Sequence, residues 1–291
     1  MGSNGIKQTS LSRTIKRSKR SDRVAFILLI GLAILFLAPI FIVFVNSFKG
    51  KFFISDTPFL LPNKETFVSF DNYLNGITKT GFSHAFGWSL FITVTSVITI
   101  VFFTSMTGWY ITRVKNKFNN FLYFLFAFSM IVPFQMVMFT MTKMANVLKL
   151  DNPVGIIVIY LGFGSGLSVF MFSGFVKSIP IEIEEAAMMD GGNPIQTFFY
   201  VVLPILKPIA ITVSILNTMW IWNDYLLPYL VIGTEYKTIP IAIQYLRGGY
   251  GSIDMGAMMA MLVLAIVPII AFYLTCQKYI IEGVVAGAVK G

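Results

Sequence analysis

Long apolar stretches constrain this chain more than any other feature. A membrane-spanning helix needs about 20 mostly apolar residues to cross a hydrocarbon layer about 30 Å thick. The sequence has six such stretches, over residues 24–48, 86–112, 119–146, 153–176, 209–233 and 256–281. With 56% of its 291 residues hydrophobic and 12% charged, the chain has more apolar surface than one soluble core could bury. We therefore predict an all-α integral membrane protein with six transmembrane helices.

The first stretch has to be distinguished from a secretion signal. Its apolar run is longer than the core of a signal peptide, and no small-residue cleavage site follows at Phe48-Lys49. We interpret it as an uncleaved span between a basic tail, residues 1–23, and a loop, residues 49–85. A short helix is expected in this loop near Ser69–Tyr73.

The distribution of Lys and Arg predicts the orientation. The net charge of +9 is concentrated in the N-terminal tail and at the ends of apolar stretches. This pattern is typical of membrane topology and argues against a nucleic-acid partner. Because Lys and Arg are enriched on the cytoplasmic side, we predict that both termini and the loop 177–208 are cytoplasmic and that the loop 49–85 is extracellular. The single Cys276 excludes an intrachain disulfide, and the single His84 argues against a dedicated zinc site.

The loop 177–208 combines a short acidic helix with a sharp bend. Residues 181–189 are strong helix formers, and their acidic first turn complements the positive end of a helix dipole. Gly191 can take the left-handed conformation that ends a helix, and Asn193-Pro194 is a typical start of the next one. The sequence therefore predicts two helices joined by a bend.

Two interpretations of this loop are open, docking into a partner protein and resting on lipid. Helices that rest on lipid are usually basic, whereas this loop has no Lys or Arg between Lys177 and Lys207. The small apolar surface at residues 186–189, with its acidic flank, favours a groove in a partner protein.

The same loop resembles the EAA motif of ATP-binding-cassette (ABC) importer permeases. That motif is Glu-Ala-Ala, three residues, Gly, nine residues, an aliphatic residue, one residue and Leu-Pro. It corresponds here to Glu185, Ala186, Ala187, Gly191, Val201, Leu203 and Pro204, with Val201 in place of the usual Ile. The resemblance implies that the loop, with Asp190, forms a coupling helix. In that role Glu185 would pair with a basic residue of an ATPase subunit, the two alanines would allow close approach, and Gly191 would permit the bend.

The resemblance extends over residues 24–291. Residues 222–228, 238–240 and 277–291 are similar to carbohydrate-uptake permeases, in particular to the second, six-span subunit of the maltose-type pair, and overall to permeases for raffinose or multiple sugars. This implies the type I ABC importer permease fold, with a core over 86–282 and a cytoplasmic tail over 283–291. In such a tail Gly287, Lys290 and Gly291 would contact the ATPase subunits, and a frayed terminus is the alternative.

Polar and aromatic residues near the fifth stretch are the substrate-pathway candidates. An acid at membrane depth usually faces the bundle interior or water, and aromatic rings beside Asn and Asp resemble a sugar-binding surface. The alternative is an interhelical polar clamp with an interfacial aromatic belt, and in the maltose-type pair the other subunit makes most sugar contacts. The candidates are Trp220, Trp222, Asn223, Asp224, Tyr225 and, in the third stretch, Gln135. Candidate contacts with a solute-binding protein, in the loop 234–255, are Tyr245, Arg247, Gly248, Gly249 and Tyr250.

These observations predict a transport subunit and not an enzyme. The chain has no Gly-x-x-x-x-Gly-Lys-[Ser/Thr] sequence, so ATP and Mg would be bound by a partner and no cofactor by this chain. The resemblance implies a second permease subunit, two copies of an ATPase subunit, an extracellular solute-binding protein and a bacterial cell membrane.

The expected cargo is a carbohydrate, an oligosaccharide by resemblance, with glycerol-3-phosphate as the alternative. A doubly charged phosphate would need Arg or Lys along the pathway, and no clear one lies within a span. An ion-coupled secondary transporter would show repeated halves and several intramembrane acids. Neither it nor a membrane scaffold or sensor would need the docking loop.

Overall fold

The computed structural model describes residues 4–246 and 253–288, with side chains for 22–246 and 253–279. This part of the protein is almost entirely helical, and an isolated β-bridge joins Lys49 and Phe67. The α-helices are α1 (Asn4–Asn46), α2 (Lys51–Asp56), α3 (Asp71–Thr80), α4 (Phe82–Arg113), α5 (Lys117–Ser129), α6 (Phe134–Val147), α7 (Gly155–Val176), α8 (Ile181–Met189), α9 (Pro194–Thr197), α10 (Leu203–Ile205), α11 (Lys207–Asn223), α12 (Leu226–Val231), α13 (Ile239–Gln244) and α14 (Met255–Ala288). The all-α prediction is confirmed.

Within the described residues, four helical segments are long and apolar enough to cross a membrane by themselves. They are Asp22–Asn46 of α1, α4, α7 and Met255–Tyr279 of α14. Two bent pairs, α5 with α6 and Pro194–Ile205 with α11, bring the number to six if each pair is counted as one span. The prediction of six spans therefore agrees with the structure when the bent pairs are included.

The third predicted span, 119–146, is broken. Its two halves, α5 and α6, meet at an angle of 109°. Pro133 accounts for the break, because proline has no backbone N–H and disfavours helical conformation in the residue before it. The result is a sharp turn in place of one continuous spanning helix.

The fifth predicted span, 209–233, does not form one helix. Helix α11 ends at Asn223, and Asp224 has an extended backbone with ψ of 126°. The Asp224 carboxylate accepts a hydrogen bond from the N–H of Leu227 (3.4 Å) in the first turn of α12. A side-chain acceptor at this position favours the start of a new helix, so the chain breaks where continuation was predicted.

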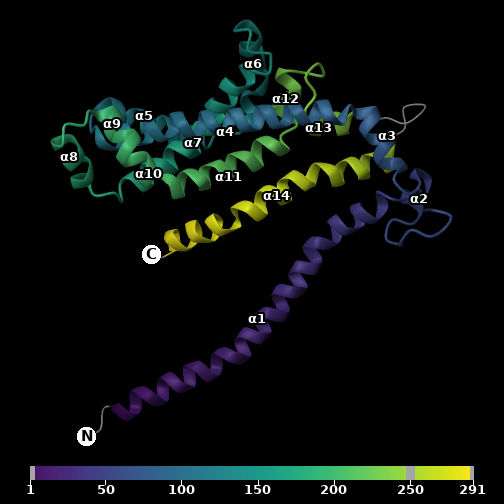
Figure 1. The fold of residues 1–291 in the computed structure, drawn as a ribbon, viewed down its shortest axis with the longest axis horizontal. Helices are drawn as coiled ribbons and strands as arrows, with labels where there is room; N and C mark the ends of the chain where they lie inside the picture. The colour runs from purple at the N-terminus through teal and green to yellow at the C-terminus, as the bar shows by residue number, and fades with distance from the viewer. Residues whose placement is uncertain (1–3, 247–252, 289–291) are drawn as a thin grey trace.

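Helices α4, α7 and α11 form the centre of the bundle (Figure 1). Gly108 lets α4 and α7 approach closely, because a Cβ at this position would lie 2.7 Å from the Cβ of Phe172. Small residues at such crossings are typical of membrane helices. Figure 1 places α8 and α9 at one end of the bundle and α2 and α3 at the other. We call these the α8 end and the α3 end.

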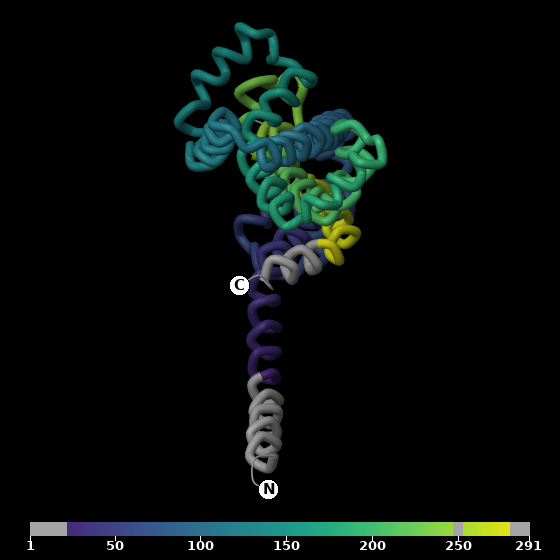
Figure 2. Tube along the Cα trace, turned by 90° about the vertical axis from the view of Figure 1, so that its left-hand side faces the viewer, coloured from purple at the N-terminus to yellow at the C-terminus, as the bar shows by residue number. Residues whose placement is uncertain are grey.

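Helix α1 lies largely apart from this bundle. Figures 1 and 2 show it diverging from the body of the protein toward the N-terminus. The most apolar window of Asp22–Asn46 has a mean hydropathy of 3.1 and no buried residue. A helix that is apolar all round and unburied has to face lipid or another protein.

The loop 49–85 is more helical than predicted. The helix expected near Ser69–Tyr73 is α3, which begins at Asp71 and extends to Thr80, and α4 begins at Phe82. Asn72 Nδ2 donates to the backbone oxygens of Ser47 (2.8 Å) and Lys49 (2.7 Å), which ties α3 to the end of α1. These buried polar contacts therefore fix the loop to the end of α1.

An ion pair joins α3 to the start of α14. Lys79 Nζ lies 2.6 Å from Asp254 Oδ2, and the Asp254 carboxylate also accepts a hydrogen bond from the N–H of Ala257 (3.2 Å). Partial burial by itself raises the pKa of Asp254, but these hydrogen bonds and the charge of Lys79 outweigh it and leave the pKa below its usual value.

Candidate functional site

Helix α8 and the bend that follows it have the predicted local structure. The helix begins at Ile181, after Pro180, and ends at Met189, and Gly191 has a φ of +92°. The N–H groups of Gly191 and Gly192 bond to the carbonyls of Met188 and Ala187, both at 3.1 Å, and so close the helix end. This left-handed turn is the reason for a glycine at position 191.

The chain then restarts at α9 with a capping box. Asn193 Oδ1 accepts from the N–H of Gln196, and Gln196 Oε1 accepts from the N–H of Asn193, both at 2.9 Å. Pro194 occupies the first turn, where its missing N–H costs no hydrogen bond. The predicted start of this helix is confirmed.

A π-helical turn, Phe198–Val202, leads into Leu203 and Pro204 of the motif. The wider turn directly precedes the proline, which has no N–H to give to a regular helix. Phe198, Val202 and the following Leu206 are buried against residues of α7 such as Phe172. The Leu-Pro end of the motif therefore lies where the bent segment returns into the bundle.

Sequence reasoning missed the burial of Glu184. This residue is 3% exposed, although it was expected on the accessible acidic flank of α8. Its Oε1 accepts from Nε of Arg113 (2.8 Å) and forms an ion pair with Nη2 of Arg113 (2.7 Å). Its Oε2 accepts from the indole N–H of Trp109 (2.8 Å). We call Trp109, Arg113 and Glu184 the α4–α8 clamp.

The clamp also reaches the chain on either side of α8. Arg113 Nη2 donates to the carbonyl of Ile179 (2.9 Å), just before the helix begins. The ring of Trp109 lies 5.3 Å from that of Phe198, centroid to centroid, after the bend. A signal was present in the sequence, since Trp109 and Arg113 are four residues apart and share one helix face.

The opposite surface of α8 and the bend is open. Glu185, Ala186 and Asp190 are exposed, and Met189 is 82% exposed. Tyr200, at 80% exposure, lines with Ala187 and Gly191 a shallow cavity of about 390 Å³ beside the bend. This end of the protein therefore presents several acidic and several apolar groups on a preformed surface.

A second cavity, of about 450 Å³, lies between the end of α11 and helices α13 and α14. It brings together three of the predicted pathway residues, Trp222, Asn223 and Tyr225, and adds Gln244. The other residues that line it are Ile239, Pro240, Ile243, Leu262, Ala265, Ile266 and Ile269. The lining is therefore aromatic, aliphatic and amide, without a formal charge.

Two further pathway candidates face another direction. Asp224 accepts a hydrogen bond from the hydroxyl of Tyr160 on α7 (3.1 Å), and Trp220 packs edge-on against the Tyr160 ring at 5.4 Å. Tyr160 is fully buried. Trp222 donates to the carbonyl of Ala265 on α14 (3.3 Å). For Asp224 and Trp220 these contacts match the interhelical clamp that was the alternative to sugar binding.

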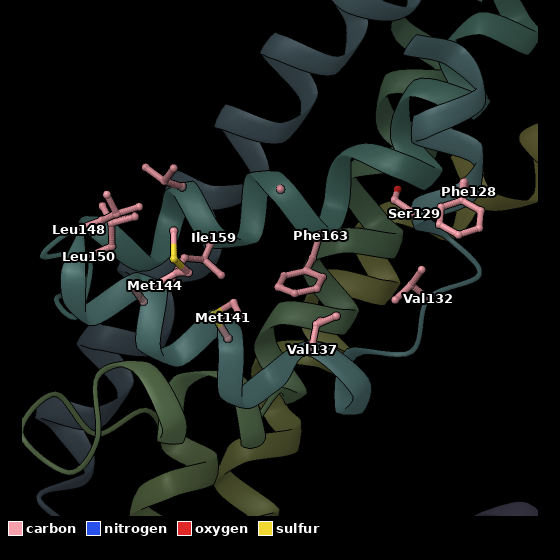
Figure 3. A pocket seen from close by; sticks show the side chains of 13 residues that line it. Phe128, Ser129, Val132, Val137, Met141, Met144, Leu148, Leu150, Ile159 and Phe163 are labelled. Atoms are coloured by element: carbon pink, nitrogen blue, oxygen red, sulfur yellow. The ribbon is translucent and has the colours of Figure 1, made fainter. Parts of the chain in front are cut away.

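A third cavity, of about 490 Å³, lies between α5, α6 and α7 (Figure 3). Its lining is apolar apart from Ser129, whose hydroxyl is bonded to the carbonyl of Phe126 (2.7 Å). Figure 3 shows Met141, Ile159 and Phe163 around its middle. Such a lining offers few hydrogen-bond partners for the hydroxyl groups of a sugar.

The remaining candidates are not brought together by the described structure. Gln135 is exposed on α6 and does not line the cavity beside Asn223. Tyr245 is exposed and donates to the hydroxyl of Tyr229 (3.1 Å). Helix α14 extends past the predicted end of the sixth span and includes Gly287. Arg247, Gly248, Gly249, Tyr250, Lys290 and Gly291 lie outside the described residues.

Comparisons with known proteins agree on one family. Residues 100–285 match the model of a family described as binding-protein-dependent transport system inner membrane component. The chain is 38% identical over 262 residues to the probable starch degradation products transport system permease protein AmyC of Thermoanaerobacterium thermosulfurigenes, covering 90% of this chain and 94% of that protein. It is 34% identical over 270 residues to the multiple sugar-binding transport system permease protein MsmG of Streptococcus mutans serotype c, covering 91% and 96%.

A solved structure has the same fold. It is the crystal structure of a bacterial ABC transporter involved in the import of the acidic polysaccharide alginate. One of its chains superimposes on this protein with a TM-score of 0.73 and 25% sequence identity, covering 90% of this chain and 98% of that chain.

Proposed function

We propose that this chain, which belongs to the family of binding-protein-dependent transport system inner membrane components, is the permease subunit of an ABC importer that carries an oligosaccharide into the cytoplasm. The relatives AmyC and MsmG, named for starch degradation products and multiple sugars, support the carbohydrate class. ATP is hydrolysed by a separate subunit, and this chain supplies the membrane passage.

The ATPase subunit binds at the α8 end. Glu185 is exposed there beside small and apolar groups, whereas its neighbour Glu184 is buried in the α4–α8 clamp. An exposed carboxylate on a short, rigid helix suits a basic partner in a protein groove. ATP binding closes the ATPase dimer, α8 moves with it, and the two permease halves alternate between outward-facing and inward-facing states.

The observation that carries the carbohydrate assignment is the uncharged cavity beside Asn223. Aromatic rings such as Tyr225 can stack on the apolar face of a sugar, and the amides of Asn223 and Gln244 can bond to its hydroxyls. A doubly charged phosphate would require cationic donors, and none lines this cavity. The lining therefore favours a neutral carbohydrate over glycerol-3-phosphate.

The chain works with other proteins at both membrane faces. With α8 on the cytoplasmic side, as the Lys and Arg distribution favours, both termini are cytoplasmic and the α3 end faces a solute-binding protein outside a bacterial cell membrane. The family description names this dependence on a binding protein. The unburied apolar surface of α1 supports contact with a second permease subunit or lipid.

Uptake of labelled sugars tests this proposal. Cells with and without the chain are given maltodextrins, raffinose, stachyose or glycerol-3-phosphate, together with cells that carry Asn223→Ala or, as a matched amide control outside the cavity, Gln135→Ala. We expect the deletion to abolish uptake of one oligosaccharide, Asn223→Ala to raise its KM, and Gln135→Ala to leave it unchanged. Loss of glycerol-3-phosphate uptake alone would refute the carbohydrate assignment.

A further inference from the structure

The α4–α8 clamp uses every acceptor atom of one buried carboxylate. The side chains of Arg113 and Glu184 are 16% and 4% exposed, and both carboxylate oxygens are bonded to groups of α4. The other glutamates of α8, Glu182 and Glu185, are exposed. Since a buried charge is stable only when it is paired and fully hydrogen-bonded, the clamp fixes the start of α8 to the end of α4.

The other end of α4 contacts two residues that line the uncharged cavity. The ring of Phe86 packs edge-on against Trp222 at 5.9 Å, and the hydroxyl of Ser89 accepts from the N–H of Ile239 (2.8 Å). Trp222 and Ile239 both line that cavity. Helix α4 has 32 residues, so it spans about 48 Å at 1.5 Å per residue. One continuous helix thus joins the clamp to the cavity wall.

We infer that the clamp makes α4 the rigid element through which a movement of α8 reaches the cavity, with Glu184, Arg113 and Trp109 as positioning residues for coupling. The inference rests on the proposed function of the chain, because it assumes that an ATPase subunit moves α8. Glu185 faces the partner on the exposed side of α8, and Glu184, the residue before it, passes the movement inward.

A competing route runs through α7. This helix is joined to α8 by the chain itself, through residues 177–180, and it packs against α4. If α7 carried the movement, loss of the clamp would leave the connection intact. Variants of the clamp therefore distinguish the two routes, since they cut the link to α4 and leave the covalent link to α7.

The test is an ATP-dependent signal at the far end of α4. The full complex with its partner permease and ATPase subunits carries a fluorescent probe on Ser83→Cys, an exposed position at the α3 end of α4, in a Cys276→Ser background. ATP is added without sugar, so this signal does not depend on the identity of the substrate. Retention of the ATPase subunit is measured on the same samples, and ATP hydrolysed per sugar imported is measured separately on the same complexes with sugar present.

We expect ATP to shift the probe signal in the parent complex and Glu184→Gln to abolish that shift while the ATPase subunit stays bound. Trp109→Phe keeps an aromatic ring and removes the indole N–H donor, and it should reduce the shift without abolishing it. This variant serves as the test if the complex with Glu184→Gln does not assemble. Glu182→Gln, on the exposed face of α8, is the matched control and should leave the shift unchanged.

An unchanged probe shift in an assembled Glu184→Gln complex, or in Trp109→Phe where the former does not assemble, would overturn the inference and favour α7. A parent complex that gives the shift but imports no sugar would contradict the proposed function. It would not contradict the inference that α4 carries the movement of α8. If the proposed function and the inference are both correct, the clamp variants that lose the shift should also hydrolyse more ATP per sugar imported.

Discussion

Replacing Gly191 by alanine should weaken the affinity of the permease for its ATPase subunit by about 5- to 30-fold. Residue 191 has a φ of +92°, and a Cβ there would meet no atom within 4 Å. The cost therefore comes from the backbone alone, roughly 1–2 kcal/mol for an L-residue in a left-handed conformation. Because about 1.4 kcal/mol corresponds to a tenfold change in an equilibrium constant, this strain sets the expected range.

The assay is a titration of labelled ATPase subunit against the purified permease complex, read by fluorescence anisotropy. Gly191→Asn should lose less affinity, since asparagine tolerates the left-handed region. Gly174→Ala is the matched control, because its Cβ also meets nothing within 4 Å but the residue lies inside α7. Equal affinities of wild type and Gly191→Ala would refute the reasoning, since the bend could then form without a left-handed residue.

Three further predictions concern stability. Gly108→Ala places a Cβ against the α7 backbone, 3.2 Å from the nearest backbone nitrogen, and should cost about 1–3 kcal/mol. An unchanged thermal midpoint would contradict the close α4–α7 contact. The pKa of Asp254 is below its usual value, so its ion pair stabilises the folded state above about pH 4 and this stabilisation is lost as pH falls further. Asp254→Asn should therefore be less stable than wild type by about 0.2–1 kcal/mol at pH 7, and this difference should shrink at pH 3 in denaturant titrations. A difference that grows in acid would contradict this. Asp224→Leu should reduce the yield of folded complex more than Asp224→Asn, because only leucine leaves the buried Tyr160 hydroxyl without an acceptor, at a cost of about 1–3 kcal/mol. Equal yields would show that this hydrogen bond does not contribute.

The local features of the docking loop could be predicted from the sequence because each is decided by neighbouring residues. Gly191 requires a turn, and Asn193 with Pro194 defines a helix start, whatever the rest of the fold does. Four of the six apolar stretches likewise form single helices long enough to span a membrane, as their length predicts.

The features that were wrong or missed depend on distant contacts. Glu184 and Glu185 have the same charge and the same helix propensity, and which of them is buried is decided by Arg113, 71 residues earlier in the chain. The break at Asp224 depends on a carboxylate that accepts hydrogen bonds both from the first turn of α12 and from the Tyr160 hydroxyl on α7. Hydropathy could not indicate either outcome, because it records how apolar a segment is and not what it faces.

ATP-dependent uptake into proteoliposomes tests the central claim most directly. The vesicles contain this chain with its partner permease and ATPase subunits, and the oligosaccharide identified in cells is supplied with its binding protein. We predict that the sugar accumulates only when ATP is present on the side of the membrane where the ATPase subunits lie. Glu185→Ala should lower uptake, and the exposed Glu182→Ala should not. Accumulation driven by a proton or sodium gradient without ATP would contradict the account.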